Sequence, residues 1–403
     1  MITVILIILT VLQIIGSVIL GWSGVIVALG LPRKKPNRNL NGRKNRFAVI
    51  VCARNEEAVI ARLLTSLKEQ HYPKDAWHVY LLADHCTDRT AAIGRQYPFV
   101  TVYERNDGAA SGKGAALSWG IEHLLRDFRD SFDAVLVFDA DNLAEPDFMK
   151  NINGALNSGN DIVQGHRIAG EPFRSVITEW YAVYWMFYSH IYSYPREKLG
   201  LSCFLTGTGF SVRKELLLRY GWNTASITED VEFAVQECLR GGRVAFEASA
   251  VCYDEQPAGL SVMMRQLLRW CTGSHQIFRM YMKKWLREFV KHPGIRLIDM
   301  MALLLMGPCS VLTFLCPLAA NIIFSVSAHR IHPLQVIIFA GSYLSGVILP
   351  GIVAKYKGIP FKKIWRGVLT FPVFLWLYML CSLGTFFRQE TKWTSIEHRG
   401  IEK

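Results

Sequence analysis

Four long apolar segments constrain the fold of this chain more than any other feature of its sequence. The first runs from Ile2 to Leu31, and three more lie at Leu297–Val326, Leu334–Ala354 and Val368–Phe387. About 20 consecutive apolar residues are enough for a helix to span a membrane. The chain has 403 residues, of which 51% are hydrophobic. It is therefore predicted to be an integral membrane protein with one soluble domain, roughly Phe47 to Pro293.

Basic residues predict how these segments are oriented. Arg33-Lys-Lys-Pro-Asn-Arg38 and Arg43-Lys-Asn-Arg46 follow the first segment directly, and an excess of Lys and Arg marks the cytoplasmic side of a membrane. Residues 1–31 have no basic region before them and no small-residue cleavage site after them, so they are interpreted as a retained anchor and not a signal peptide. The soluble domain is expected in the cytosol, at the plasma membrane, with the N-terminus outside.

The last apolar segment is harder to orient, because both of its flanks are basic. The loop Lys355–Arg366 precedes it, and the tail 388–403 carries four more basic residues, which are Arg388, Lys392, Arg399 and Lys403. Either the tail lies outside, against the charge rule, or residues 368–387 are re-entrant or interfacial, which Pro372 would permit. We favour the second alternative.

The overall charge and the cysteines narrow the class of protein further. The formal net charge is +12, and much of the surplus lies beside the apolar segments. Attraction to anionic lipid headgroups explains this surplus more simply than nucleic-acid binding does. The nine cysteines form no CxxC pair, which is typical of reduced thiols rather than a disulfide framework.

Strand-like and helical patterns alternate in the first half of the soluble domain. Short apolar runs of strand type alternate with three helical segments. Apolar residues recur at helical spacing between Val59 and Leu67, a second helix is expected to begin at Thr87, and a third lies around Lys113–Leu125. Such alternation predicts an α/β domain with a mostly parallel sheet and right-handed crossovers. The predicted strands are Phe47–Cys52, His78–Ala83, Thr101–Glu104 and Ala134–Phe138.

Three of the predicted strands end at residues that could hold a ligand. Ligands of parallel sheets bind beyond the carboxyl ends of the strands, where Ala53, Asp84 and Asp139 fall. Asp139-Ala-Asp141 places two carboxylates where a hard divalent cation and a phosphate could meet, although an isolated Asp-x-Asp is more often a turn. Asp84 could accept hydrogen bonds from a base or ribose or could be a helix cap, and Asp88 is interpreted as a cap.

A glycine-flanked lysine follows the third strand, in Ser111-Gly-Lys-Gly114. The simpler interpretation is a solvated turn, and the alternative is a lysine with backbone amides placed against a diphosphate. The eight-residue P-loop pattern is missing, which argues against a nucleoside triphosphatase.

Two further motifs lie in the second half of the domain. Ser226-Ile-Thr-Glu-Asp230 opens a helical pattern, and Thr228 could simply be its N-cap. Gln266-Leu-Leu-Arg-Trp270 lies in an amphipathic stretch, residues 259–293, which could simply be interfacial helices with Trp and Arg at headgroup level.

The order of these motifs resembles the processive family 2 glycosyltransferases, which are membrane β-glycosyl synthases akin to cellulose, hyaluronan and poly-N-acetylglucosamine synthases. The resemblance rests on Asp84, Asp139-Ala-Asp141, Thr228-Glu-Asp230 and Gln266-Leu-Leu-Arg-Trp270, and it covers Phe47 to Trp270. It implies a GT-A-like nucleotide-diphospho-sugar transferase domain at residues 47–258, joined to transmembrane helices, with C-terminal membrane segments at 297–387. One motif departs from the family pattern, because Ala83-Asp84 stands where paired aspartates are common.

The resemblance also implies a role for each matching residue. Asp230 would be the catalytic base, and Mg²⁺ or Mn²⁺ would be bound by Asp141, with Asp139 on the nucleotide side. Ala53 and Asp84 would line the uridine pocket. The remaining substrate-binding residues would be Lys113, Asp139, Gln266 and Arg269 near the diphosphate, Trp270 stacked on the acceptor sugar, and the segment Thr206-Gly-Thr-Gly-Phe210 on the acceptor side.

The residue types fit an inverting transfer from a UDP-sugar. A cation and Arg269 could neutralise charge on the leaving diphosphate, and one carboxylate base suits a single displacement. A growing glycan is the expected acceptor, because Trp270 suits a sugar ring. The alternative is one sugar transferred to a lipid such as a diacylglycerol, a ceramide or a polyprenyl phosphate. A non-catalytic scaffold or transporter is disfavoured by the intact carboxylates and Arg269.

Overall fold

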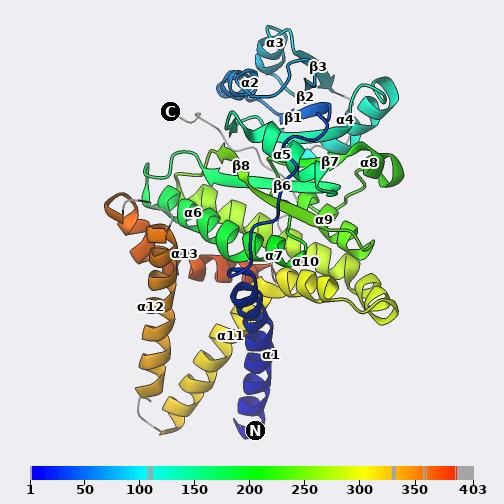
Figure 1. The fold of residues 1–403 in the computed structure, drawn as a ribbon. Helices are drawn as coiled ribbons and strands as arrows, with labels where there is room; N and C mark the ends of the chain where they lie inside the picture. Colours follow the sequence, from blue (N-terminus) through cyan, green and yellow to red (C-terminus); the bar gives the residue numbers. More distant parts are fainter. Residues whose placement is uncertain are drawn as a thin grey trace.

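An α/β domain lies above a set of long helices in the computed structural model (Figure 1). The structure describes residues 2–106, 108, 112–328, 333–356, 359, 361–385 and 387. Within these residues the α/β domain contains an eight-stranded sheet of order β3-β2-β1-β4-β7-β6-β8-β5. Its strands are β1 (Phe47–Ala53), β2 (Trp77–Asp84), β3 (Val100–Arg105), β4 (Ala134–Asp139), β5 (Leu143–Ala144), β6 (Ile162–Ala169), β7 (Phe210–Arg213) and β8 (Val244–Asp254).

The four strands predicted from the sequence are present and parallel. β1 pairs in parallel with β2 and β4, and β2 pairs in parallel with β3. The second half of the sheet is mixed: β7 is antiparallel to β4 and β6, β5 is antiparallel to β8, and β6 and β8 are parallel. The sheet is therefore mostly parallel, as expected.

Both faces of the sheet are buried, which explains why β1 is apolar throughout. Phe47, Val49 and Val51 point into one core, and Ala48 and Ile50 point into the other. The first core includes α2 (Ile60–Lys68) and α5 (Phe148–Asn157), and the second includes α4 (Lys113–Asp127), α8 (Lys214–Tyr220) and α9 (Glu229–Leu239). The sheet is thus held between helices, with its strand ends left for a site.

One predicted helix start is wrong. The helix expected to open at Thr87 is α3 (Thr90–Gly94), and the Thr87 backbone N–H instead donates to the Asn55 side chain over 2.8 Å. Asp88 accepts from the Thr90 N–H over 3.0 Å, but it lies one residue before the N-cap position, which Arg89 occupies. Ser111, the first residue of the predicted lysine turn, lies outside the described residues.

The long helices include three that could cross a membrane. Among the described residues, Thr3–Gly30, Ile295–Val326 and Phe361–Gly384 are long and apolar enough to do so. The amphipathic stretch 259–293 forms a single helix, α10, where several were expected. The helices of this layer are α1 (Ile2–Gly30), α6 (Val176–Phe187), the π-helix η1 (Tyr188–Ser193), α7 (Tyr194–Leu199), α10 (Leu260–Lys291), α11 (Ile295–Ala328), α12 (Pro333–Tyr356) and α13 (Phe361–Gly384).

Helix α13 lies crosswise to α1, α11 and α12 and beneath α6 (Figure 1). Its Arg366 is bound by the buried carboxylate of Glu179 on α6, over 2.6 and 3.0 Å, and the Gly367 N–H donates to the same carboxylate over 2.6 Å. This position agrees with an interfacial segment, but the helix is also long enough to cross, so its membrane topology stays a prediction. The basic tail 388–403, and residues 357, 358 and 360 of the preceding loop, lie outside the described residues.

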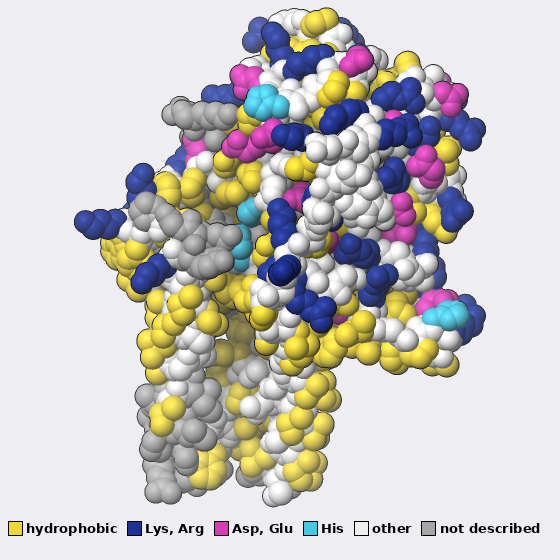
Figure 2. All heavy atoms as spheres, in the orientation of Figure 1, with side chains coloured by type: hydrophobic (Ala, Val, Ile, Leu, Met, Phe, Trp, Pro, Cys, Tyr) yellow, Lys and Arg dark blue, Asp and Glu magenta, His cyan; other side chains and the backbone are white. Residues whose placement is uncertain are grey.

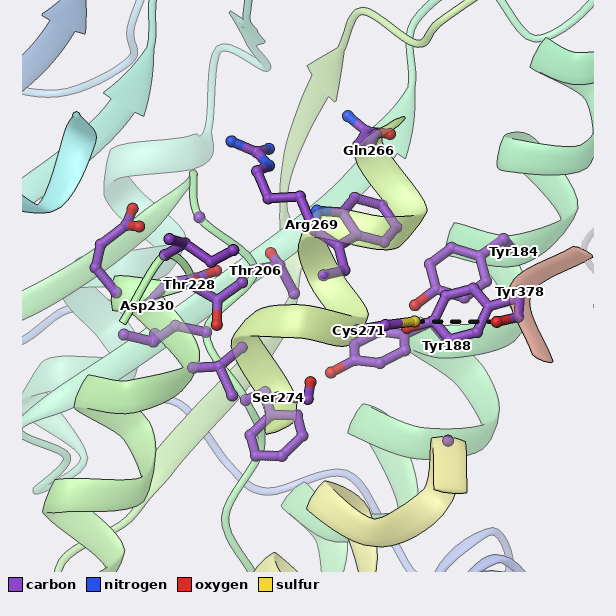
Figure 3. A pocket seen from close by; sticks show the side chains of 18 of the residues that line it. Tyr184, Tyr188, Thr206, Thr228, Asp230, Gln266, Arg269, Cys271, Ser274 and Tyr378 are labelled. Atoms are coloured by element: carbon purple, nitrogen blue, oxygen red, sulfur yellow. Dashed lines mark hydrogen bonds between the residues drawn. The ribbon is translucent and has the colours of Figure 1, made fainter. Parts of the chain in front are cut away.

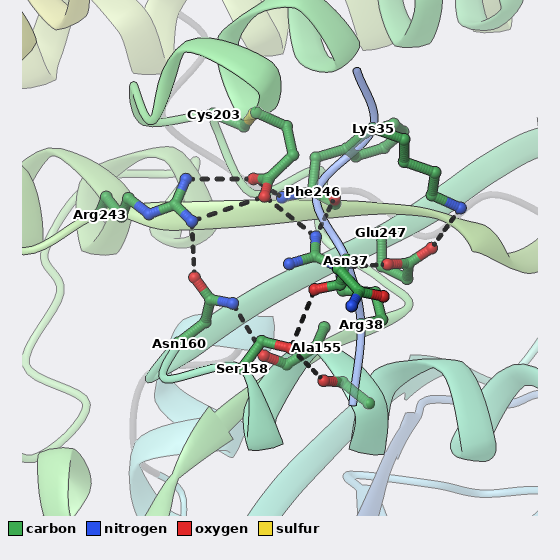
Figure 4. Close-up of polar contacts among 12 residues, drawn as sticks. Lys35, Asn37, Arg38, Ala155, Ser158, Asn160, Cys203, Arg243, Phe246 and Glu247 are labelled. Carbon is green, nitrogen blue, oxygen red and sulfur yellow. Dashed lines mark hydrogen bonds and ion pairs between the residues drawn. The ribbon is translucent and has the colours of Figure 1, made fainter. Parts of the chain in front are cut away.

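Buried ion pairs join the long helices to the α/β domain. Arg38, eight residues after α1, donates to Glu247 over 2.6 Å and to Glu197 over 3.0 Å (Figure 4). Arg196 on α7 makes two 2.9 Å hydrogen bonds to Asp299 on α11, which also accepts from the Trp22 indole of α1 over 3.0 Å. These contacts fix α1 and α11 against the domain.

Candidate active site

Every site residue predicted from the sequence lines one cavity of about 1370 Å³. The cavity opens at the carboxyl ends of β1, β2 and β4 and continues along α10 to the long helices. The residues brought together are Ala53, Asp84, Lys113, Asp139, Asp141, Asp230, Gln266, Arg269 and Trp270. The roles expected for them remain predictions, but these roles require the residues to converge, as they do here from six helices and strands and from the loop after β4.

The two aspartates of Asp139-Ala-Asp141 belong to a cluster of three. Carboxylate oxygens of Asp139, Asp141 and Asp254 all lie within 4.8 Å of one another. Carboxylate oxygens are the ligands that Mg²⁺ and Mn²⁺ prefer, so the cluster fits a divalent cation. Asp254 was not predicted, although it ends strand β8 as Asp84 ends β2 and Asp139 ends β4. This repeated pattern, in which a strand ends with an aspartate, could have identified Asp254 from the sequence.

Two buried cations balance this acidic cluster. The Lys113 ammonium, in the first residue of α4, donates to Asp139 and, over 2.6 Å, to the Gly207 carbonyl. Burial alone would lower the pKa of Lys113, but the charges of Asp139 and Glu229 outweigh it and raise that pKa. Arg167 on β6 donates to Asp254 over 2.9 Å and to the Thr206 carbonyl over 2.6 Å. Lys113 therefore lies in the cavity, paired with Asp139, and its contact with a diphosphate stays a prediction. Arg167 was missed by the sequence reasoning.

Asp84 lies at a separate corner of the cavity, where β2 ends. It accepts a hydrogen bond of 2.9 Å from the buried Arg105 and one of 2.8 Å from His85. His85 has a φ of 53°, in the left-handed region, as does Asn55 with 58°. The side chain of Asp84 makes no helix-capping bond, since α3 begins after Asp88. Asp84 is thus a carboxylate oriented by a buried arginine beside Ala53.

The motif Thr228-Glu-Asp230 forms the N-terminus of α9, but not in the way the capping interpretation supposed. Thr228 occupies the N-cap position, yet its hydroxyl makes no cap hydrogen bond and is a buried polar group without a partner among the described atoms. The capping prediction for Thr228 is therefore wrong. The reason is α10, whose Gly273 lies directly against the Thr228 hydroxyl and methyl and leaves them no freedom to turn back towards α9.

Glu229 and Asp230 are neighbouring carboxylates with altered acidity. Burial, and next the charge of Asp230, raise the pKa of Glu229 to about 7, against the opposing charges of Lys113 and Arg269. Burial also raises the pKa of Asp230, while the Val231 N–H and nearby cations oppose that shift. A carboxylate with a raised pKa is a better proton acceptor, which is what a general base needs.

Gly207 lies close to both Lys113 and Asp230. A β-carbon placed on Gly207 would be 3.5 Å from the Asp230 carboxylate and 3.8 Å from the Lys113 ammonium, and the φ of this glycine is +86°. Thr206 and Gly207, the first two residues of the segment Thr206–Phe210, therefore line the cavity, whereas Thr208 and Phe210 are buried in the domain.

Helix α10 supplies the rest of the site (Figure 3). Arg269 extends into the cavity and makes no hydrogen bond or ion pair with the described residues, which leaves its charge available to a ligand. Gln266 accepts from the Tyr181 hydroxyl of α6. Trp270 stacks on Tyr184, with ring centroids 6.0 Å apart and planes inclined by 25°. Gln266 and Trp270 are thus fixed by α6, whereas Arg269 is the ligand-facing cation.

The aromatic residues of α6 and η1 contribute both to a packed core and to the lining of the cavity. Trp180 and Tyr181 are buried in the core between α6, α10 and α13. Tyr184, Trp185 and Tyr188 line the cavity as well. Burial raises the pKa of Tyr188 well above its usual value, so its phenol stays neutral and can donate a hydrogen bond.

Comparison with known proteins identifies relatives of this chain. A family model described as "Glycosyltransferase like family 2" matches residues 45–273. The probable glycosyltransferase YdaM of Bacillus subtilis is 25% identical over 264 residues, which are 63% of this chain and 60% of the relative. The beta-monoglucosyldiacylglycerol synthase of Synechocystis sp. is 27% identical over 245 residues, 58% of this chain and 48% of that protein. The poly-beta-1,6-N-acetyl-D-glucosamine synthase of Staphylococcus aureus is 26% identical over 262 residues, 60% and 58% of the two chains.

A solved structure resembles almost the whole chain. The mannosyltransferase PcManGT from Pyrobaculum calidifontis, in complex with GDP-Man and Mn²⁺, matches with a TM-score of 0.63 and 19% identity, covering 95% of this chain and 99% of that one. This likeness establishes the GT-A-like fold that the sequence predicted. The matches to the three curated relatives, by contrast, span only about half to three fifths of each relative's length.

Proposed function

The chain belongs to glycosyltransferase family 2, and we propose that it is a membrane-integral inverting enzyme that moves a sugar from a UDP-sugar to an acceptor hydroxyl, forming a β-linkage. One observation carries the proposal. A single cavity contains a three-carboxylate cluster, a ligand-facing arginine and a separate carboxylate with a raised pKa. A cation site, a charge for the leaving group and a base are the three parts that such a transfer needs.

The donor would lie along the strand ends. Asp84 and Ala53 would contact the uridine, and Lys113 and Arg269 would contact the diphosphate. Asp141, with Asp139 and Asp254, would hold Mg²⁺ or Mn²⁺. When bound, such a cation neutralises negative charge on the diphosphate as it leaves. The Mn²⁺ and GDP-Man in the complex of PcManGT support a cation beside a nucleotide in this fold.

Asp230 would act on the acceptor. Its carboxylate accepts the proton of the acceptor hydroxyl as that oxygen forms a bond to the anomeric carbon of the sugar. The bond between that carbon and the diphosphate oxygen breaks, and the oxygen keeps the electron pair. Lys113 and Arg269 stabilise the charge on this leaving group. One displacement inverts the anomeric configuration, from an α-linked donor to a β-linked product.

Two acceptor classes fit this chemistry. A growing glycan is supported by Trp270, whose ring suits a sugar face, and by the name of the S. aureus relative. A lipid is supported by the name of the Synechocystis relative and by a cavity that reaches α11 and α13. In either case the apolar helices would hold the protein in the plasma membrane, with the site on the cytoplasmic side marked by Arg33, Lys34 and Lys35.

A donor panel tests the proposal. Release of nucleoside diphosphate by the purified protein is followed with UDP-GlcNAc, UDP-Glc, UDP-Gal, UDP-GlcA and GDP-Man, with and without Mn²⁺ or Mg²⁺. We expect cation-dependent UDP release from one UDP-sugar. Release of GDP alone would contradict the uridine assignment, and no release from any donor would contradict the proposed enzyme.

A further inference from the structure

The cavity is larger than the donor site. Pockets for single small ligands have volumes of about 300–1,000 Å³, and this one has about 1370 Å³. Beyond Trp270 it continues away from the strand ends and is lined by α11 and α13, with Leu20 of α1 and Ser342 of α12. The extra volume thus lies among helices that are long and apolar enough to cross a membrane, including α1, α11 and α13.

The wall of this second branch is mostly apolar, with the hydroxyls of Ser310, Ser342 and Ser382 among its polar groups. On α11 it is formed by Leu304, Met306 and Phe314, and on α13 by Leu375, Trp376 and Met379. Aliphatic, thioether and phenyl groups offer no hydrogen bonds to the hydroxyls of a polysaccharide, whereas they are favourable neighbours for hydrocarbon. Figure 2 shows the surface hollowed between the helices beneath the domain, with hydrophobic side chains around the opening.

A row of tyrosines separates the two branches. Tyr184, Tyr188 and Tyr192 follow one another at four-residue spacing, and all three line the cavity. Their ring centroids are 6.0 and 5.7 Å apart in sequence order, and Tyr184 also stacks on Trp270. Figure 3 shows Tyr184 and Tyr188 on the far side of α10 from Asp230. Aromatic faces with phenolic hydroxyls suit a polar head, at the boundary where polar lining gives way to apolar lining.

We propose that the acceptor is an amphiphile: a hydroxyl-bearing head lies on Trp270 and the tyrosine row, and its hydrocarbon chain lies between α11 and α13. This inference rests on the proposed transferase function and assigns its acceptor to the lipid alternative, rather than to the growing glycan expected from the sequence. The polar end of the cavity places the hydroxyl towards Asp230, and the apolar end receives the chain from the membrane.

Variants that fill the apolar branch test the proposal. Ser310 on α11 lines the cavity, and Ser345 on α12 is exposed and does not line it. Each hydroxyl donates to the carbonyl three residues earlier, over 2.6 Å for Ser310 and 2.9 Å for Ser345. Ser310→Phe and Ser345→Phe therefore lose the same local bond and differ in where the ring is placed. Leu375→Trp, in the cavity, and Leu380→Trp, on the same helix but not lining the cavity, are a second matched pair of similarly exposed residues.

The first measurement uses n-alkyl β-glucosides of one to twelve carbons as acceptors, with the protein in lipid nanodiscs. We expect the KM of the wild type to fall with chain length, by up to about fourfold for each buried methylene. Ser310→Phe and Leu375→Trp should lose this dependence on chain length, while the two surface variants should show the dependence of the wild type. A KM independent of chain length in the wild type, or a ladder of oligosaccharides as the product, overturns the lipid assignment and leaves the transferase intact.

The second measurement does not need turnover. A diacylglycerol with a diazirine at the end of one acyl chain is photolysed with the protein, and the labelled peptides are identified. Labels are expected on residues 303–314 and 375–379, and should be lost in the two cavity variants. Labels confined to the exposed faces of the helices overturn the proposal. Absence of UDP release from every donor, together with labels in the branch, would instead contradict the transferase function and leave a lipid-binding protein.

Discussion

Gly273 of α10 lies directly against the side chain of Thr228, so that a β-carbon at position 273 would overlap the threonine hydroxyl. Thr228 precedes the predicted base Asp230 by two residues, and Gly273 follows Trp270 by three. The base and the acceptor-side helix are therefore positioned by one close contact. This contact exists because glycine allows a helix to approach another element without an intervening side chain.

Gly273→Ala should separate these two parts of the site. Overpacking of this kind costs about 1–3 kcal/mol, and we expect a lower thermal midpoint together with reduced kcat. Thr228→Ala removes the two atoms of greatest overlap, the hydroxyl and the methyl, and leaves the β-carbon of residue 228 at 2.8 Å, so the double variant should recover part of both losses, as measured by a double-mutant cycle. Gly341→Ala is the matched control, because a β-carbon on this helical glycine of α12 meets nothing within 4 Å. That control should gain up to about 1 kcal/mol of stability.

Asp230→Asn tests the base. The amide keeps the shape of the side chain but cannot accept the acceptor proton, so transfer should fall by roughly 10²- to 10⁴-fold. Donor affinity, measured calorimetrically with the UDP-sugar and Mn²⁺, should stay close to that of the wild type, and the folded state should not be destabilised, because a buried charge is removed. Near-normal turnover in this variant would exclude Asp230 as the base.

Lys113→Met should change metal and nucleotide binding in opposite directions. The variant loses the cation that pairs with Asp139, so Mn²⁺ should bind more tightly to the remaining carboxylates, as measured by titration of the donor-free protein. Donor affinity should fall by roughly tenfold or more, the order of a lost charge-assisted hydrogen bond. Lys214→Met, which removes an exposed lysine bonded to the Arg129 carbonyl, is the control. Weaker Mn²⁺ binding in Lys113→Met would show that Lys113 does not compete for Asp139.

Asp254→Asn tests the third carboxylate of the cluster. If Asp254 shares the cation with Asp139 and Asp141, the variant should bind Mn²⁺ more weakly and need a higher Mn²⁺ concentration for half-maximal UDP release. Asp161→Asn is the control, since that carboxylate is 63% exposed and lies outside the cavity. Unchanged Mn²⁺ affinity in Asp254→Asn would restrict the cation to the two aspartates that the sequence identified.

Glu229→Gln should make the protein less sensitive to alkali. The pKa of Glu229 is raised from 4.5 to about 7, so the folded protein holds this proton more tightly than the unfolded chain does. The associated stability is present below pH 4.5 and is lost as the pH rises to about 7, by at most about 3 kcal/mol. Wild type and Glu229→Gln should therefore melt at similar temperatures near pH 4.5, and the variant should melt higher at pH 8. A constant difference across this range would contradict the raised pKa.

The sequence predicted the structure best where a local pattern of residues reflects a single strand or helix. Strands β1 to β4 are buried on both faces and alternate with helices, so their apolar runs revealed both the sheet and the strand ends that carry Asp84 and Asp139. Asp254 lies on β8 and Arg167 lies on β6, both in the mixed half of the sheet. In that half, no regular alternation of strands and helices in the sequence predicts the strand order. The place of both residues beside Asp139 depends on the pairing of β6 with β8, whose partners Ile162 and Val244, and Ala169 and Asp254, are 82 and 85 residues apart in the chain, and a local pattern does not encode such pairing.

Two local predictions failed because of residues that are distant in the chain. Asn55 accepts the Thr87 N–H and delays the start of α3, and Gly273 covers the hydroxyl that was expected to cap α9. The apolar extension of the cavity could not be predicted from the sequence either. Its wall is formed by Leu20, α11 and α13, which come together only in the folded protein.

The ion pair between Arg196 and Asp299 has a consequence for biosynthesis. Both side chains are about 1% exposed, and the third member of the group, Trp22, is 277 residues from Asp299 in the chain. Arg196 leaves the ribosome long before Asp299 does. A buried arginine without its carboxylate partner destabilises the folded state by several kcal/mol. The packing of α7 against α1 can therefore be completed only after α11 has been synthesised. A nascent chain that stops before residue 299 cannot complete its catalytic domain in the form described here.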